Sequence, residues 1–216
     1  MNPEPAPLRK RGRPPQGDEN AVPRETILSA ALAAFASLGY EGFSSRKLAR
    51  ALGVSHGLLN VRFGTKDQLW YACVDWGLGE LADRLTAIPA TGPIEERFRQ
   101  AVIRTLLTID ELPGLLQVVN QEGPIGGHRL GYLTDTIIAE RHSLLEALIA
   151  EGVAAGRFRP VPARLIFLMV AHGGGTLFAM KPLAQRLDLI RTGDRAEMEA
   201  HAAEIADLML QAVRAS

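Results

Sequence analysis

The chain has 216 residues, of which 47% are hydrophobic and 22% charged, enough to bury a substantial core in one large domain or in a small domain joined to a larger one. Its 24 Lys and Arg balance 24 Asp and Glu, and a formal net charge of zero by itself argues against a nucleic-acid-binding protein. A single cysteine excludes an intramolecular disulfide and a cysteine-cluster metal site, and the lack of a signal peptide or of a bilayer-spanning apolar run predicts a cytoplasmic protein without a membrane partner.

The charge is unevenly distributed, because residues 1–66 hold ten Lys and Arg against five Asp and Glu (+5), which leaves fourteen against nineteen (−5) in the remainder. Residues 1–22 are rich in proline and nearly free of large apolar side chains, so we expect a disordered basic arm. Its stretch "RKRGRPP" places Arg11 and Arg13 on either side of a glycine, a strip thin enough for the minor groove of A·T-rich DNA. A plain basic leader is the alternative.

Helical signals begin at Pro23. The spacing of Ile27, Ala31, Phe35 and Leu38 predicts a first helix that ends at Gly39. A second short helix is expected over residues 45–52 and a third over 55–63, joined by a tight turn at a glycine. This arrangement is typical of a helix-turn-helix, although any αα-hairpin shows small and apolar residues at such spacings. We therefore predict a DNA-binding domain over residues 23–66.

The third helix would enter a major groove, with Asn60 suited to adenine, Val61 to a thymine methyl group and Arg62 to guanine or a phosphate. The remaining candidates are basic or hydroxyl-bearing residues for the DNA backbone and the exposed start of the third helix. The DNA-binding candidates in the folded domain are Ser45, Arg46, Ser55, His56, Gly57, Asn60, Val61, Arg62 and Lys66.

Residues 67–216 carry further helical signals. A capping box at residues 65–68 opens a helix that reaches about residue 87, and Pro93 is expected to open the next one. A shorter helix is predicted over 115–121, and a glycine-rich loop at 122–131 leads into a long helix over 132–155. Another helix is predicted over 162–180, and a capping box formed by Asp194 and Glu197 opens a last helix that ends near residue 214. No segment shows convincing alternation of period two, so the chain is predicted to be all-α.

The helical body has large apolar surface with a few polar side chains on or near it, which is the composition that a site for a small-molecule effector requires. The same residues would equally serve to fill a core, and no effector identity follows from them. The ligand-binding candidates are Trp76, Phe98, Val102, Asn120, His128, Tyr132 and His172.

A single helix-turn-helix contacts too few bases to find one operator, so function implies a homodimer. The last two predicted helices offer small residues for close approach and an apolar stripe, although the stripe could instead be monomer core. The dimer-interface candidates are Ala171, Gly174, Gly175, Ile205, Leu208, Met209 and Val213. No catalytic motif, metal-ligand spacing or cofactor-binding loop occurs, so we expect no enzyme, no cofactor and no metal.

Residues 24–70, "RETILSAALAAFASLGYEGFSSRKLARALGVSHGLLNVRFGTKDQLW", resemble the N-terminal domain of TetR-type transcriptional regulators. The resemblance implies a three-helix DNA-binding domain followed by a larger helical domain for effector binding and dimerisation, and it favours Arg46 for DNA contact. "RKRGRPP" also resembles the core of an AT-hook. The chain departs from the family at residues 60–62, which lack the usual aromatic pair with His or Tyr, so we expect a changed operator sequence.

These patterns together predict a ligand-responsive repressor that binds a palindromic operator with A·T-rich flanks on double-stranded DNA as a dimer. Two alternatives remain open. One is a constitutive or activating DNA-binding protein without an effector, and the other is a helical enzyme.

Overall fold

The computed structural model of the chain describes residues 22–215, without the side chains of residues 137–143. The predicted contacts of Arg11 and Arg13 lie outside these residues. Within residues 22–215 every named element is a helix, and the β-pairing is an isolated antiparallel bridge between Phe158 and Arg214. The prediction of an all-α chain is confirmed. None of the described helices is long and apolar enough to cross a membrane.

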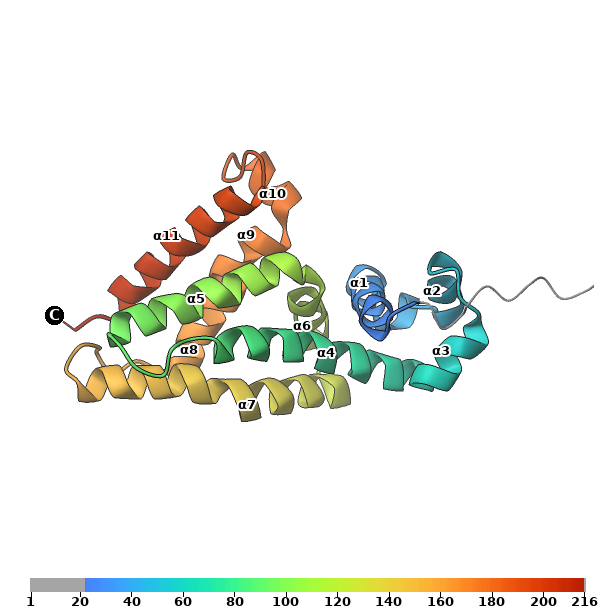
Figure 1. Cartoon of the computed structure of the whole chain (residues 1–216), viewed down its shortest axis with the longest axis horizontal. Helices are drawn as coiled ribbons and strands as arrows, with labels where there is room; N and C mark the ends of the chain where they lie inside the picture. Colours follow the sequence, from blue (N-terminus) through green and yellow to red (C-terminus); the bar gives the residue numbers. More distant parts are fainter. Residues whose placement is uncertain (1–21, 216) are drawn as a thin grey trace, which may run out of the picture.

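Three helices form a head at one end of the molecule (Figure 1). They are α1 (Arg24–Gly42), α2 (Ser45–Ala51) and α3 (His56–Phe63). The chain leaves helical geometry inside α1 at Gly39, where φ is 69°, and turns between α2 and α3 at Gly53, where φ is 68°. Glycine suits both positions because a side chain is strained at a positive φ. The predicted helix-turn-helix therefore forms through local backbone chemistry.

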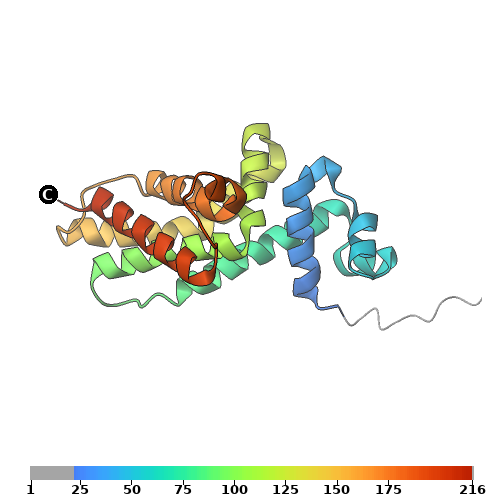
Figure 2. The same cartoon turned by 90° about the horizontal axis from the view of Figure 1, so that it is seen from above.

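The body follows along α4, which begins at the head and runs into the other helices (Figures 1 and 2). Its helices are α4 (Lys66–Thr86), α5 (Ile94–Glu111), α6 (Pro113–Ile125), α7 (Gly127–Ala154), α8 (Ala163–Leu168), the π-helical turn η1 (Met169–Gly174), α9 (Gly175–Ala179), α10 (Lys181–Arg186) and α11 (Arg195–Val213). The predicted capping box of α4 is present, because the Thr65 hydroxyl accepts from the Gln68 amide and the Gln68 side chain accepts from the Thr65 amide.

The structure corrects several predicted boundaries in the body. The loop predicted over residues 122–131 is almost entirely helical, because two consecutive glycines with a positive φ, Gly126 and Gly127, suffice to separate α6 from α7. Helix α10 was not predicted. At α11 the Asp194 carboxylate caps the helix, but Glu197 does not complete a capping box. Its carboxylate instead accepts from the backbone amides of residues 191–193, which ties the preceding loop to the helix.

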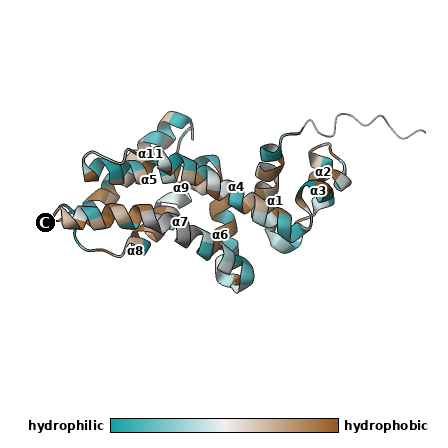
Figure 3. Cartoon of the chain, turned by 60° about the horizontal axis from the view of Figure 1, so that its bottom comes forward, coloured by the Kyte–Doolittle hydropathy of each residue, from teal (hydrophilic) through white to brown (hydrophobic). Residues whose placement is uncertain are grey.

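Two groups of buried side chains stabilise the fold. The larger lies within the body around α5, α8, η1 and α11, and includes Phe98 and Phe178. The second begins in the head and continues through α4, α6 and α7 with Trp70 and Leu133. Figure 3 shows apolar and polar residues sharing the surface of each long helix, as such two-sided packing requires. The head is therefore packed onto the body and shares a hydrophobic core with it.

Close packing of α1 on α4 and α6 depends on two glycines. A Cβ atom on Gly77 would lie 3.1 Å from a Leu32 side-chain atom, and one on Gly114 would lie 3.3 Å from Leu32. Both distances are tighter than ordinary contacts, so small residues let the three helices approach. This contact positions the head relative to the body.

Candidate nucleic-acid interface and ligand cavities

Helix α3 has one face in the core of the head and the opposite face in solvent. Leu59 and Phe63 are buried, whereas Gly57 and Asn60 are exposed and Val61 is 86% exposed. An apolar side chain this open on a folded helix has no packing role and suits a partner surface. The predicted reading face at these three positions therefore lies on the surface.

Hydroxyl groups cap the two short helices. The Ser44 hydroxyl accepts from the Lys47 amide at 3.4 Å, and the Ser55 hydroxyl accepts from the Leu58 amide at 3.1 Å. Ser44 is thus the N-cap of α2, and Ser45 is half-buried in its first turn. Ser55 is used as a cap, so its predicted DNA contact competes with a structural role. His56 is half-buried at the start of α3.

The predicted DNA-binding basic side chains of the head differ in their exposure to solvent. Arg46 is exposed in the first turn of α2, beside the exposed Lys47. Arg62 is half-buried, and its guanidinium donates to the Val22 carbonyl at 2.8 Å. The Arg62 side chain thus holds the chain entering α1, and its contact with guanine or a phosphate stays a prediction. Lys66 places Nζ 4.3 Å from the Tyr40 ring centroid and 3.5 Å from the Glu41 carbonyl, so it also lies against the head.

A cluster that we call the joint connects head and body. Its members are Tyr40 from α1, Asp67 from α4, Glu122 from α6 and Arg129 from α7. The Tyr40 hydroxyl bonds the Asp67 carboxylate, and the Arg129 guanidinium lies 3.8 Å from the Tyr40 ring centroid. Burial and the neighbouring Asp67 raise the pKa of Tyr40 to about 12, so the phenol stays protonated and donates. Three helices, α1, α4 and α7, therefore meet at Tyr40, and α6 joins them through the contact of Glu122 with Arg129.

The body side of the joint is an ion pair. The Arg129 guanidinium contacts a Glu122 carboxylate oxygen at 2.9 Å, and the Glu122 side chain is only 3% exposed. Its other oxygen is buried without a hydrogen-bond partner in the structure. Nearby, the Gln121 amide donates to the Ala36 carbonyl of α1 at 2.5 Å. Buried carboxylates depend strongly on their counter-ion, so Arg129 holds this corner together.

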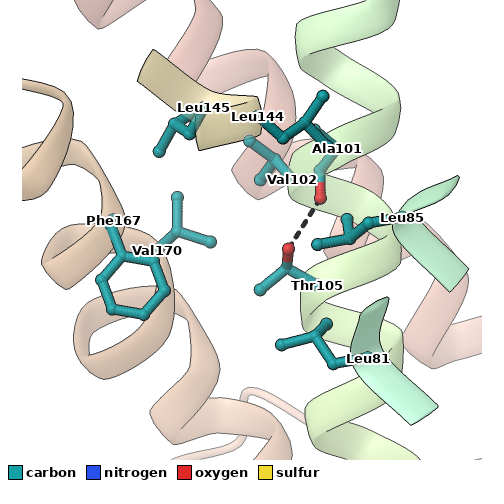
Figure 4. Close-up of a pocket in the computed structure, with 9 residues that line it drawn as sticks. All are labelled: Leu81, Leu85, Ala101, Val102, Thr105, Leu144, Leu145, Phe167 and Val170. Carbon is teal, nitrogen blue, oxygen red and sulfur yellow. Dashed lines mark hydrogen bonds between the residues drawn. The ribbon is translucent and has the colours of Figure 1, made fainter. Parts of the chain in front are cut away.

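Two adjoining apolar cavities lie in the body. Both are bordered by α4, α5, α8 and η1, with α7 completing cavity A and α6 completing cavity B. Cavity A has a volume of about 40 Å³ and cavity B of about 70 Å³. Cavity A, shown in Figure 4, is lined by Leu81, Leu85, Ala101, Val102, Thr105, Leu144, Leu145, Phe167 and Val170. Cavity B is lined by Leu78, Leu81, Thr105, Ile109, Leu115, Leu116, Val119, Phe167, Ala171 and His172. Helix α4 therefore reaches from the head to both cavities.

The predicted ligand-binding residues are not gathered in one place. Val102 and His172 line the cavities, but Phe98 is fully buried with its ring edge-on to Phe158, because it fills the core beside them. His128 is exposed at the start of α7. Neither Phe98 nor His128 lines cavity A or B.

The other three ligand-binding candidates lie outside cavities A and B. Trp76 lines an open groove with Arg24, and Asn120 lines a separate groove between α1, α6 and α9. The Tyr132 hydroxyl donates to the Asp75 carboxylate at 2.5 Å. None of the three lines cavity A or B, so the structure places them apart from these two spaces.

Sequence reasoning missed most of the cavity lining. The spacing of Leu78, Leu81 and Leu85 places them along one face of α4, and this signal was present in the sequence. Which apolar face encloses space, as opposed to being filled, depends on packing between distant helices. Phe167 lies near the end of α8 and Val170 within the π-helical turn that follows, which no local pattern predicts.

Most predicted dimer-interface residues face their own chain. Ala171, Gly175 and Val213 are buried in the core of the body, and a Cβ atom on Gly174 would lie 2.9 Å from an Ile205 side-chain atom. Ile205 and Met209 pack against the same core. The close approach that these small residues permit is therefore between helices of one chain, which is the monomer-core alternative for this stripe. Leu208 remains 65% exposed.

Residues 27–73 match the family model described as bacterial regulatory proteins, tetR family. The chain is 28% identical to the HTH-type transcriptional dual regulator CecR of Shigella flexneri over 145 residues, 59% of this chain and 63% of that relative. It is 28% identical to the HTH-type transcriptional regulatory protein RaaS of Mycobacterium tuberculosis over 167 residues, 76% of this chain and 74% of that relative. The match therefore spans less than two thirds of CecR.

The fold is also similar to that of solved proteins. A crystal structure of a bacterial regulatory protein in the tetR family from Rhodococcus RHA1 superposes with a TM-score of 0.71 at 20% identity, covering 90% of this chain and 100% of the other. The head and the helical body are thus both parts of a shared architecture.

Proposed function

The chain belongs to the TetR family of bacterial regulatory proteins, and we propose that it is a ligand-responsive repressor that binds a palindromic operator as a homodimer. One observation carries the proposal. A capped helix presents unpacked side chains to solvent at one end of the molecule, while α4 connects that end directly to two internal cavities. Such an arrangement would link DNA bound at the head to a ligand bound in the body.

DNA reading would centre on α3. Asn60 has the donor and acceptor that pair with adenine in the major groove, and Val61 offers a methyl surface to thymine. Arg46 and Lys47 would contact phosphates from the first turn of α2, where exposed backbone amides also favour an anion. The N-terminal arm, through Arg11 and Arg13, would add minor-groove contacts beside the site.

The dimer needs a face that the monomer leaves open. Leu165, Leu168 and Met169 are exposed on α8 and the start of η1, and Leu208 is exposed on α11. These large apolar side chains suit an isologous interface in which the same patch meets itself. We assign the dimer contact to this patch, in place of the buried stripe expected from the sequence.

Release of DNA would follow from a population shift. A ligand in cavities A and B would favour a body conformation with a displaced α4, and it can shift the equilibrium only by its preference for that state. The joint would transmit the displacement, since Asp67 of α4 and Arg129 of α7 both hold Tyr40 of α1. The two α3 helices of the dimer would then leave the spacing of about 34 Å that adjacent major grooves require.

The proposal is tested by selecting bound sequences from random DNA with the full-length protein at near-physiological salt. We expect a palindrome with half-sites about one helical turn apart and A·T-rich flanks. A protein lacking residues 1–20 should keep the palindrome but lose flank preference and part of its salt dependence. Recovery of no enriched motif by the full-length protein would contradict the proposal and direct attention to enzymatic activity.

A further inference from the structure

Cavities A and B form one interrupted tract. Leu81, Thr105 and Phe167 line both of them, so the tract continues from Leu144 of α7 to His172 of η1. In Figure 4 the side chains of Phe167 and Val170 lie on one side of cavity A, opposite those of Leu81, Leu85 and Thr105. A ligand that used the whole tract would therefore be longer than it is wide.

The described lining side chains carry no formal charge apart from the titratable His172. The Thr105 hydroxyl already donates to the Ala101 carbonyl at 2.8 Å. Burial lowers the pKa of His172, so its imidazole is neutral at pH 7 and offers one donor and one acceptor. A charged ligand group would lose its water here without gaining a described counter-ion, which is costly.

The cavities are too small for most ligands as they stand. Their volumes of about 40 and 70 Å³ compare with roughly 300 Å³ or more for sites that hold drug-sized molecules. Phe167 is the largest side chain that borders both cavities, and it lies two residues before the π-helical turn that supplies Val170, Ala171 and His172. π-Helical turns are rare and recur at functional sites. Movement of Phe167 would join the two spaces.

We propose that the body binds an uncharged, chain-like amphiphile, with its hydrocarbon chain in the joined cavities and its single polar end beside His172, and that Phe167 is the side chain displaced to admit it. The inference rests on the proposed effector-binding role of the body and names the chemical class of the effector. A neutral hydroxyl or carbonyl group at the polar end would pair with the imidazole.

The test compares three ten-carbon probes by isothermal titration calorimetry on the full-length protein at pH 7. The probes are 1-decanol, decanoate and decylammonium, which share a chain and differ in charge. We expect 1-decanol to bind at least about 100-fold more tightly than either ion, because each ion must be desolvated without a counter-ion. Equal or tighter binding of decanoate or decylammonium would overturn the proposal.

Two variants locate the probe. Phe167→Ala removes the displaced side chain and should strengthen 1-decanol binding several-fold, with Phe167→Leu as the replacement if the alanine variant fails to fold. Leu183→Ala is the control, because Leu183 is exposed on α10 and lines neither cavity. Weaker binding in Leu183→Ala with unchanged binding in Phe167→Ala would overturn the proposal, since the chain would then lie on the exposed surface.

The outcome is separable from that of the proposed function. If 1-decanol shows the expected preference and variant effects in a protein that selects no DNA motif, the ligand site stands and only the regulatory role fails. If DNA selection succeeds and all three probes bind alike or only the ions bind, the regulatory function stands and the ligand class proposed here is wrong.

Discussion

In the head, the side chains that face DNA in our proposal are already exposed on a helix whose start is capped by Ser55. In the body, the side chains that face a ligand are packed around spaces of about 40 and 70 Å³. The first surface can bind without rearrangement, whereas the second must open. The difference indicates that the head is a preformed DNA-binding surface, whereas the body is the part that must change its conformation. The joint connects the head to the body, so we expect variants in the joint to have the largest effect.

The largest expected effect is that of Arg129→Ala in the joint. The change leaves the Glu122 carboxylate, which is 3% exposed, without its counter-ion. We expect the free energy of unfolding to fall by about 3 kcal/mol, as is usual when one partner of a buried ion pair is removed. Urea denaturation measures it. The double variant Glu122→Gln/Arg129→Ala should recover part of the loss, and equal instability of both variants would contradict the role of the ion pair.

A second prediction concerns packing in the body, with α7 providing its own control. A Cβ atom on Gly152 would lie 2.1 Å from the buried Phe158 ring, whereas one on Gly131 would meet nothing within 4 Å. Gly152→Ala should therefore lower the free energy of unfolding by roughly 1–3 kcal/mol through overpacking. Gly131→Ala should raise it by about 0.5–1 kcal/mol, because alanine favours the helix. Thermal unfolding of both variants decides, and equal stability would show that Phe158 moves aside freely.

The head could be predicted from the sequence because its determinants are local. Gly53 and Ser55 each specify a turn or a cap within three residues of themselves, and the structure has both. The hydrogen bond of Arg62 to the Val22 carbonyl could not be predicted, because this partner is 40 residues away in the sequence. Whether an arginine points to solvent or to its own chain is decided by such distant contacts.

The body could be predicted only as a set of helices. Phe98 and Phe167 look alike in the sequence, yet one is core and the other borders both cavities. Gly174 and Gly175 indicated close helix approach, and the structure shows that the approach is within the chain. Small residues indicate that two helices pack closely, but they do not indicate whether both helices belong to the same chain. The dimer interface could therefore not be predicted from them.

A third prediction tests DNA binding by the exposed face of α3. Asn60→Ala should weaken binding to the selected operator by about 10-fold to 100-fold, because a paired adenine contact contributes roughly 1–3 kcal/mol. The free energy of unfolding should change by less than about 0.5 kcal/mol, since Asn60 is exposed. Fluorescence anisotropy with labelled operator measures the affinity. Asn60→Tyr should select a different motif, and recovery of the same motif would count against base reading by Asn60.

The smallest expected effect is one of pH on the body. Hydrogen bonds from the backbone amides around Arg191 and Gly193 lower the pKa of Glu197 to about 2, from an ordinary value of 4.5. A lowered folded-state pKa stabilises the protein above pH 4.5, and this contribution is lost as pH falls from about 4.5 toward 2. Glu197→Gln should therefore lower the melting temperature at pH 7, with the difference narrowing over that range. Glu199→Gln, which alters only an exposed ion pair with Arg195, is the matched control.

The central claim is that two copies of the head read one palindrome together. The most direct test measures the affinity of the full-length protein for the selected operator and for the same operator with about five base pairs, half a helical turn, inserted between its half-sites. We predict that the insertion reduces affinity to that of an isolated half-site, because the two α3 helices can no longer face both grooves. Equal affinity for the two DNA fragments would contradict the account, since each head would then bind alone.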